Sequence, residues 1–399
     1  MRTEALSDVE IAAVTARCVA VPREAPADSF VLHAPLELAA RLGLLPWVRP
    51  ERRGAALRRI MEIGNGVEAV GPPVQPAAML TVDDPVDAAG RLVGALRAGD
   101  LDGVDTAAAA LARCCSATEL PGLLVEAVLP SLAAAGHAPI FFHLLPRVAP
   151  RGELPVELLR PLVRELARNP NWSLTWFRAR RFDGDPDLER SLVELPLLGV
   201  PGSVSIYPLM EQVETSGVAA RHLGSAVRQT PIKDGARIVL RLAARSMLLE
   251  PPDHAPYGWS HALTMPQGAL AAAPHCTDPR TALAMAATFL AGFRVALGTV
   301  DLRASYEPEP PRGDLRRALT DAPRTAAAAV WHADPADHRD LAATLAGEAA
   351  GHRDAHVVKY TLACLDAAAA DPAAARLYLA AAARLLGFWV EHPDTALPG

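Results

Sequence analysis

The chain has 399 residues, of which 51% are hydrophobic and 21% are charged, and its formal net charge is −6 at pH 7. This composition is typical of a globular protein and excludes long disordered segments. The negative net charge argues against nucleic acid as a partner. Alanine and leucine dominate while aromatic residues make up only 5%, so we predict an all-α fold, a single large multi-helix domain over residues 1–399.

The cysteines, the first residues of the chain and the longest apolar run indicate the cellular location of the protein. Five cysteines are scattered without a CxxC motif, which is typical of reduced thiols. Glu4 and Asp8 stand where a signal peptide would carry basic residues. The longest uncharged helical run, 281–293, ends at Arg294 and is too short to span a bilayer. We therefore predict a soluble cytoplasmic protein without a membrane partner.

The N-terminal part of the chain is predicted to be helical between breaker clusters. Residues 1 to about 30 form a lead-in helix that ends in PREAPADS, and His33 then lies at the mouth of a helix opened by Pro35. The stretch GPPVQPA at 71–77 predicts a connection. Further helical patterns cover 84–98, 101–115, 120–135 and 155–168.

Two histidines lie close together in GHAPIFFHLLPRV, at 136–148. His137 and His143 are six residues apart, so on one regular helix their side chains point about 120° apart. Only one of them can easily bind a given ion unless the segment bends, and Pro139 and Pro146 make a bend plausible. The other histidine is then expected to support the site or to line a pocket.

Residues 169–208 are predicted to be irregular, with one short helix that begins near Pro186. Helices are predicted again after this stretch. SYEPEPPRGD, at 305–314, is rich in proline and charge and is predicted to be a surface loop. Helical patterns cover 209–229, 235–249, 259–273, 279–298, 322–331, 335–369 (broken near Gly351) and 372–390.

The stretch GHRDAHVVKYTLAC, at 351–364, suggests a functional helix. Its periodicity predicts a helix with Val357, Val358 and Leu362 toward the core. His352, His356 and Lys359 would share one stripe of that helix, because residues three, four and seven apart lie on one face. Imidazoles and an amine are costly to bury unless something such as a metal binds them. The alternative is an exposed polar stripe on an amphipathic helix.

The common catalytic motifs are missing: GxGxxG, GxxxxGK[ST], GxSxG and HExxH do not occur in a matching context. What remains is a set of histidines, each in an apolar helical segment: His33, His137, His143, His261, His352 and His356. Helical bundles build metal sites by taking one or two ligands from each of several facing helices. Imidazoles without thiolates suit iron, zinc, copper or nickel. We therefore expect a central metal site.

Four stretches together resemble the questin oxidase-like family, whose members oxidise or cleave anthraquinone-type polyketides. They are SFVLHAPLELAARLG, GHAPIFFHLLPRV, SHALTMPQGAL and DAHVVKYTLACLDAA, and they occur in the family's order between residues 29 and 368. The sequence departs from the family pattern at Phe141 and Phe142, where many members have polar residues, and at Leu362, where an acid is common.

The resemblance implies a non-haem iron(II) oxygenase of polyketide biosynthesis that uses dioxygen as co-substrate. It implies histidine ligands together with a lysine carboxylated on its side-chain nitrogen. The matching positions are His33, His137 or His143, His261, His356 and Lys359. No catalytic residue beyond these ligands is predicted, and His352 is expected to support them from outside. The expected wall for an aromatic substrate comprises Phe141, Phe142, Trp259 and Met265.

Two other classes of function remain open at this point. One is a metal-free or NADPH-assisted Baeyer–Villiger-type monooxygenase, which activity after thorough chelation would favour. The other is a non-catalytic helical scaffold, which normal stability without metal would favour. The sequence leaves open the substrate, the need for NADPH, and whether the protein is a monomer or a homodimer.

Overall fold

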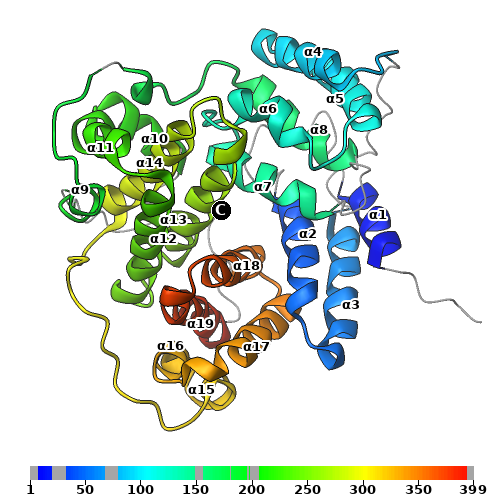
Figure 1. Ribbon diagram of the computed structural model, residues 1–399. Coiled ribbons are helices and arrows are strands. Elements are labelled where there is room, and N and C mark those ends of the chain that lie inside the picture. The colour runs from blue at the N-terminus through cyan, green and yellow to red at the C-terminus, as the bar shows by residue number, and fades with distance from the viewer. Residues whose placement is uncertain are drawn as a thin grey trace, which may run out of the picture.

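A computed structural model describes residues 8–19, 33–67, 80–148, 156–179, 181–195, 197 and 206–392 (Figure 1). These residues form α-helices and short 3₁₀ turns, and among them no strand occurs beyond an isolated bridge between Ser131 and Ser173. The buried apolar side chains form one continuous cluster. The prediction of an all-α fold is therefore confirmed.

The described part of the N-terminal half contains nine α-helices. They are α1 (Asp8–Cys18), α2 (His33–Leu44), α3 (Pro50–Val67), α4 (Pro85–Ala98), α5 (Leu101–Cys114), α6 (Leu120–Val128), α7 (Ala138–Val148), α8 (Val156–Arg168) and α9 (Leu188–Val193).

The described part of the C-terminal half contains ten α-helices. They are α10 (Ile206–Thr215), α11 (Val218–Gln229), α12 (Ile232–Leu249), α13 (Pro256–Ala271), α14 (Arg280–Leu297), α15 (Leu315–Asp321), α16 (Ala326–Trp331), α17 (His338–Gly351), α18 (Ala355–Ala370) and α19 (Ala375–Glu391).

Four helices that are far apart in sequence surround the middle of the molecule (Figure 1). Helix α2 packs against α7, α7 against α13, α13 against α18, and α18 back against α2. This closed set of contacts brings together segments separated by more than 300 residues along the chain. Side chains that point inward from these four helices must therefore meet.

Two glycines permit the close packing of this ring. An added Cβ on Gly268, in α13, would lie only 2.7 Å from the backbone carbonyl carbon of Pro139, so the two helices approach within backbone contact. Gly136 adopts φ = +73°, a conformation that residues with a Cβ rarely adopt, and it completes the turn that leads into α7. These two positions fix how α7 enters the ring.

Aspartates begin several of the helices and explain where they start. In each case the side-chain carboxylate accepts a hydrogen bond from a backbone N–H of the first turn. The capping residues are Asp84 (α4), Asp100 (α5), Asp187 (α9), Asp314 (α15) and Asp354 (α18). The last of these lies within the stretch 351–364, whose periodicity predicted a helix that includes His352.

The structure confirms the predicted break near Gly351 and corrects the prediction that His352 shares a helix with His356 and Lys359. Helix α17 ends at Gly351, and α18 begins only at Ala355, so His352 lies in the connection and not on the stripe of His356 and Lys359. The spacing of the three residues would place them on one face only if the helix were unbroken. Asp354 prevents this, because its side chain caps the N–H groups of a new helix.

Other boundaries also differ from the prediction. The helix predicted for 120–135 ends at Val128, and the one predicted for 209–229 is divided into α10 and α11 around Gly217, which has φ = +69°. Helices α3 and α15 were not predicted. The loop at 305–314 is confirmed as non-helical and largely exposed. Of the lead-in region only α1 is described, and the connection at 71–77 lies outside the described residues.

Two segments, Arg280–Leu297 and Pro372–Glu391, are long and apolar enough to cross a membrane by length and composition. In this fold 83% of the first and 61% of the second are buried inside the molecule. The apolar character of both segments is thus used for packing within the core.

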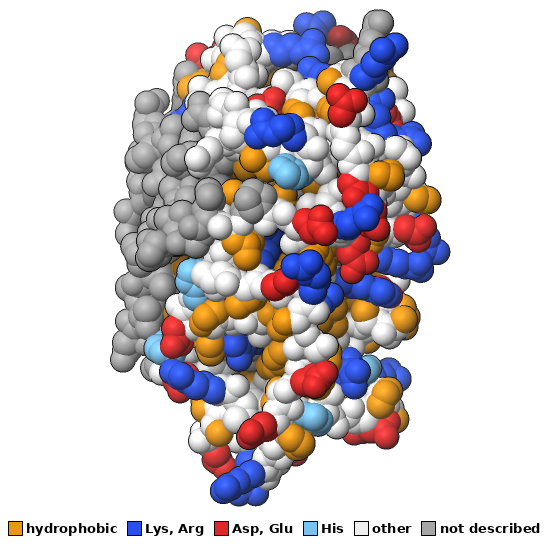
Figure 2. All heavy atoms as spheres, turned by 90° about the vertical axis from the view of Figure 1, so that its left-hand side faces the viewer, with side chains coloured by type: hydrophobic (Ala, Val, Ile, Leu, Met, Phe, Trp, Pro, Cys, Tyr) orange, Lys and Arg blue, Asp and Glu red, His pale blue; other side chains and the backbone are white. Residues whose placement is uncertain are grey.

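On the face shown in Figure 2, Lys and Arg side chains are interspersed with Asp and Glu.

A buried ion pair joins the ends of two core helices and gives a test of the fold. Arg294 Nη1 donates to Glu250 Oε1 at 2.6 Å, and the two side chains are 2% and 0% exposed. We expect Glu250→Gln to lower the free energy of unfolding by about 3–5 kcal/mol, because it leaves the guanidinium buried without its charge partner. Urea denaturation measures the effect. Asp87→Asn, in the exposed pair with Arg91, is the control and should cost less than about 1 kcal/mol.

Candidate metal centre

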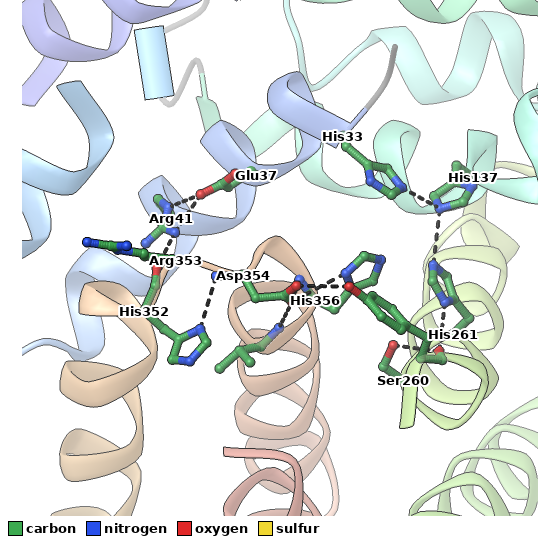
Figure 3. A network of polar contacts seen from close by, with 12 residues as sticks. His33, Glu37, Arg41, His137, Ser260, His261, His352, Arg353, Asp354 and His356 are labelled. Carbon is green, nitrogen blue, oxygen red and sulfur yellow. Dashed lines mark hydrogen bonds and ion pairs between the residues drawn. The ribbon is translucent and has the colours of Figure 1, made fainter. Parts of the chain in front are cut away.

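Four histidines meet at the centre of the ring (Figure 3): His33 on α2, His261 on α13, His356 on α18, and His137 in the turn directly before α7. His137 Nε2 lies 3.3 Å from His33 Nε2 and 3.1 Å from His261 Nε2. His356 completes the cluster, with its ring centroid 5.1 Å from those of both His33 and His261. The four imidazoles therefore form a closed ring of neighbours, which we call the four-histidine cluster.

The tautomers of two of these histidines follow from their backbone contacts. His137 Nδ1 lies 2.9 Å from the carbonyl oxygen of Ala134, and His261 Nδ1 lies 2.8 Å from that of Tyr257. A carbonyl can only accept, so both Nδ1 atoms carry the hydrogen. In the neutral rings, the two Nε2 atoms then carry lone pairs that face each other across 3.1 Å. Such a contact is repulsive unless a cation lies between the nitrogens.

Burial favours the neutral form of three of these histidines. It lowers the pKa of His261 and of His33 well below the ordinary value, and neighbouring positive groups lower both further. Burial and the charge of Lys359 lower the pKa of His356 to about 4, although Asp354 acts in the opposite direction. Neutral imidazole is the form that ligates a metal.

Lys359 lies one turn after His356 and is itself buried, with 3% of its surface exposed. Its Nζ has no hydrogen-bond partner among the described residues. Burial lowers its pKa to about 8, against the opposing effects of Asp354 and Glu37. Burial of an amine without a hydrogen-bond partner costs free energy. Lysine is rare in this chain: Lys233 and Lys359 are the two lysines among its 39 Lys and Arg residues.

The fit of this cluster to a metal can be judged from the nitrogen separations. Two nitrogens that are each about 2.1 Å from one ion lie about 3.0 Å apart at a right angle and about 3.4 Å apart at the tetrahedral angle. The observed separations of 3.1 and 3.3 Å fall in this range. As the side chains stand, however, no group of three or more described His, Cys, Asp or Glu residues is arranged to hold an ion. The donors suit a metal, but binding one requires the rings to turn toward a common point.

The structure does not bring His143 into the cluster. Its Nε2 accepts a hydrogen bond from Arg147 Nη2 at 3.3 Å, and Arg147 in turn donates to Asp366. Burial and then the Arg147 charge lower the pKa of His143 to about 4. His143 and Phe142 line a partly open pocket of about 280 Å³, together with Pro121, Pro146, Arg147, Gly268, Ala271, Ala272 and His275.

His352 was expected to support the ligands, and it does touch the segment that carries one. Its Nδ1 accepts from the backbone N–H of Asp354 at 3.0 Å. Its carbonyl accepts from Arg41, whose guanidinium is buried and also donates to the carbonyl of Ala350. The connection between α17 and α18 is thus tied to α2, the helix that begins with His33.

The residues expected to form a substrate wall are all buried, but in different places. Met265 lies four residues after His261 on α13, on the same side of the helix. Trp259 packs beneath Arg294, with the guanidinium carbon 5.5 Å from the ring centroid. Phe141 is 1% exposed and belongs to the core, whereas Phe142 lines the pocket beside His143.

Three residues near the cluster were not predicted from the sequence. Tyr257 and Asp354 contact cluster histidines directly, and the Phe293 ring stacks on His261 at 6.4 Å with an interplanar angle of 22°. The sequence could have indicated Asp354, because an aspartate directly before an apolar helical stretch is a typical first residue of a helix. Nothing in the local sequence distinguishes Tyr257 or Phe293 from other core aromatics.

Comparison of the whole chain with profiles of protein families, with curated proteins and with solved structures found no match. The function proposed below therefore depends on the geometry of the four-histidine cluster, on Lys359, and on the resemblance of the sequence blocks that contain them to the questin oxidase-like family.

Proposed function

We propose that the protein is a non-haem iron oxygenase that acts on an aromatic, polyketide-type small molecule. The observation that carries the proposal is the contact between Nε2 atoms within the four-histidine cluster. His137 Nε2 has the Nε2 atoms of His33 and His261 within 3.3 Å. In His137 and His261 the other ring nitrogen donates to a backbone carbonyl. That is the usual arrangement of a metal-binding histidine.

The ligand set that we propose consists of His33, His137, His261 and His356 as neutral imidazoles, with Lys359 in a carbamate form as an anionic oxygen donor. Mixed nitrogen and oxygen donors without thiolate suit iron(II). Iron(II), when bound, supplies the one-electron chemistry that the use of dioxygen requires and that amino-acid side chains lack.

The surrounding residues would serve the reaction by excluding water. The ring of Phe293 covers the face of His261. Met265, on α13 with His261, and Phe141, on α7, are almost fully buried. A dry, apolar surrounding strengthens the electrostatic contacts within the site and protects reactive species from side reactions. We assign an aromatic substrate because of the resemblance of the sequence blocks, and Phe142 in the pocket is the side chain we propose to contact it.

We expect the protein to bind close to one equivalent of iron(II) after anaerobic reconstitution, because the cluster offers one centre. Elemental analysis after gel filtration measures the stoichiometry, and oxygen consumption with a hydroxylated anthraquinone tests the activity. The chelated protein is the control. Metal well below one equivalent that falls further on gel filtration would contradict the proposal. Oxidation that survives complete chelation would favour a metal-free monooxygenase instead.

A further inference from the structure

Tyr257 touches two members of the four-histidine cluster through different groups. Its backbone carbonyl accepts from His261 Nδ1 at 2.8 Å. Its ring packs edge-on against His356, with centroids 4.1 Å apart and an interplanar angle of 88°. Its hydroxyl donates to Asp354 Oδ2 at 3.1 Å. One residue of α13 is therefore in contact with histidines on two helices.

Asp354 receives that hydroxyl and faces His356 with its other oxygen. Oδ1 accepts from the backbone N–H of His356 at 2.7 Å and of Val357 at 3.2 Å, which caps α18. The same oxygen lies 3.3 Å from His356 Nδ1, within ion-pair distance but outside hydrogen-bond geometry as the ring stands. A small turn of the ring would complete the bond. The carboxylate can only accept, so it favours the tautomer with hydrogen on Nδ1.

We propose that Tyr257 and Asp354 are a positioning pair that sets the orientation of His261 and His356, so that Nε2 of each faces the centre of the cluster. The hydroxyl of Tyr257 holds the Asp354 carboxylate against His356, while the carbonyl of the same residue holds His261. Outer partners of this kind fix the tautomer and the ring direction of metal ligands. The role in metal binding rests on the function proposed above, whereas the role in orienting the rings does not.

The two functional groups of Tyr257 can be separated by mutation. Tyr257→Phe removes the hydroxyl but keeps the carbonyl, so it should change His356 and leave His261 unaffected. Asp354→Ser removes the contact with His356 Nδ1 but retains a good capping residue for α18. Tyr378→Phe is the matched control, because Tyr378 donates to Asp371 Oδ2 at 3.4 Å at the opposite end of the same helix.

Two measurements test the pair. In chelated protein labelled with ¹⁵N-histidine, NMR reports the tautomer of each ring, and a His356→Gln difference spectrum assigns His356. We expect hydrogen on Nδ1 of His356 in the unaltered protein and on Nε2 in a substantial fraction of Asp354→Ser. Titration with cobalt(II), a spectroscopic substitute for iron(II), should show affinity reduced about 10-fold by Tyr257→Phe and about 100-fold by Asp354→Ser. Tyr378→Phe should change neither measurement.

The outcomes separate the two claims. If His356 keeps its tautomer in Asp354→Ser, or if Tyr378→Phe weakens cobalt binding as much as Tyr257→Phe does, the positioning pair is wrong. If the unaltered protein binds no cobalt while the tautomer of His356 responds as expected, the positioning pair stands and the proposed metal function fails.

Discussion

Replacing His137 by glutamine should abolish metal binding, whereas replacing His143 by glutamine should leave the metal content near one equivalent. His137 Nε2 lies within 3.3 Å of the Nε2 atoms of two other members of the four-histidine cluster, His33 and His261. His143 instead accepts from Arg147 beside the pocket. Loss of an outer partner typically costs about 10–100-fold in affinity, and we expect His137→Gln to exceed that range.

The comparison is well controlled because the two histidines lie six residues apart in one segment and both are largely buried. Glutamine keeps much of the volume of the imidazole, so neither change should create a large cavity. Metal content after gel filtration, read together with circular dichroism, separates loss of the ligand from loss of the fold. Complete metal loss from folded His143→Gln would show that α7 bends enough to use both residues, and equal metal retention in both variants would refute the assignment of His137.

Periodicity was sufficient to predict most of the helices, because they use apolar positions at helical spacing on one face. Helix α3 shows where it was insufficient. Its buried positions, Ala56, Ile60 and Ile63, have helical spacing, but the arginine-rich sequence around them dilutes the apolar signal. The break near Gly351 was predicted, but the residue at which α18 begins was not. His352, His356 and Lys359 have the spacing of one stripe whether or not the helix continues, and only the capping by Asp354 decides the matter.

The assembly of the site could not be read from spacing at all. His33 and His137 are 104 residues apart, and Tyr257 and Asp354 are 97 residues apart. Their contacts depend on the order in which α2, α7, α13 and α18 pack, which local patterns do not encode. The resemblance of four sequence blocks named the same four histidines as candidates, together with His143. It could not distinguish His137 from His143, because that choice depends on the turn at Gly136 that precedes α7.

Lys359→Arg should abolish metal binding although it keeps the positive charge at neutral pH. A protonated amine repels a cation and cannot ligate it. Lys359 can leave this state more easily than an exposed lysine because burial lowers its pKa to about 8, so a growing fraction is neutral as the pH rises toward and past that value. The neutral amine can add carbon dioxide to give a carbamate with an anionic oxygen and release of one proton. Arginine stays protonated throughout this range and forms no such adduct.

Three further measurements distinguish a carbamate from a merely buried lysine. Metal loading at a fixed pH near 8 should be higher with bicarbonate than in buffer free of carbon dioxide. Labelling with ¹³C-bicarbonate should give a carbamate resonance in the metal-loaded protein that is absent from Lys359→Met. Lys359→Met should fold and should be at least as stable as the chelated protein, because it removes an amine that is buried without a partner.

The chain offers a matched control, since its other lysine, Lys233, is exposed. Lys233→Arg should leave the metal content, the bicarbonate dependence and the carbamate resonance unchanged. Full metal occupancy in Lys359→Arg, at the level of Lys233→Arg, would refute the carbamate and would leave the four imidazoles as the complete ligand set. Loss of metal from both arginine variants would instead show that the effect does not depend on the buried position. The expected pattern, loss in one variant and none in the other, follows from a single physical difference: only the amine of Lys359 is removed from water and held beside the four-histidine cluster.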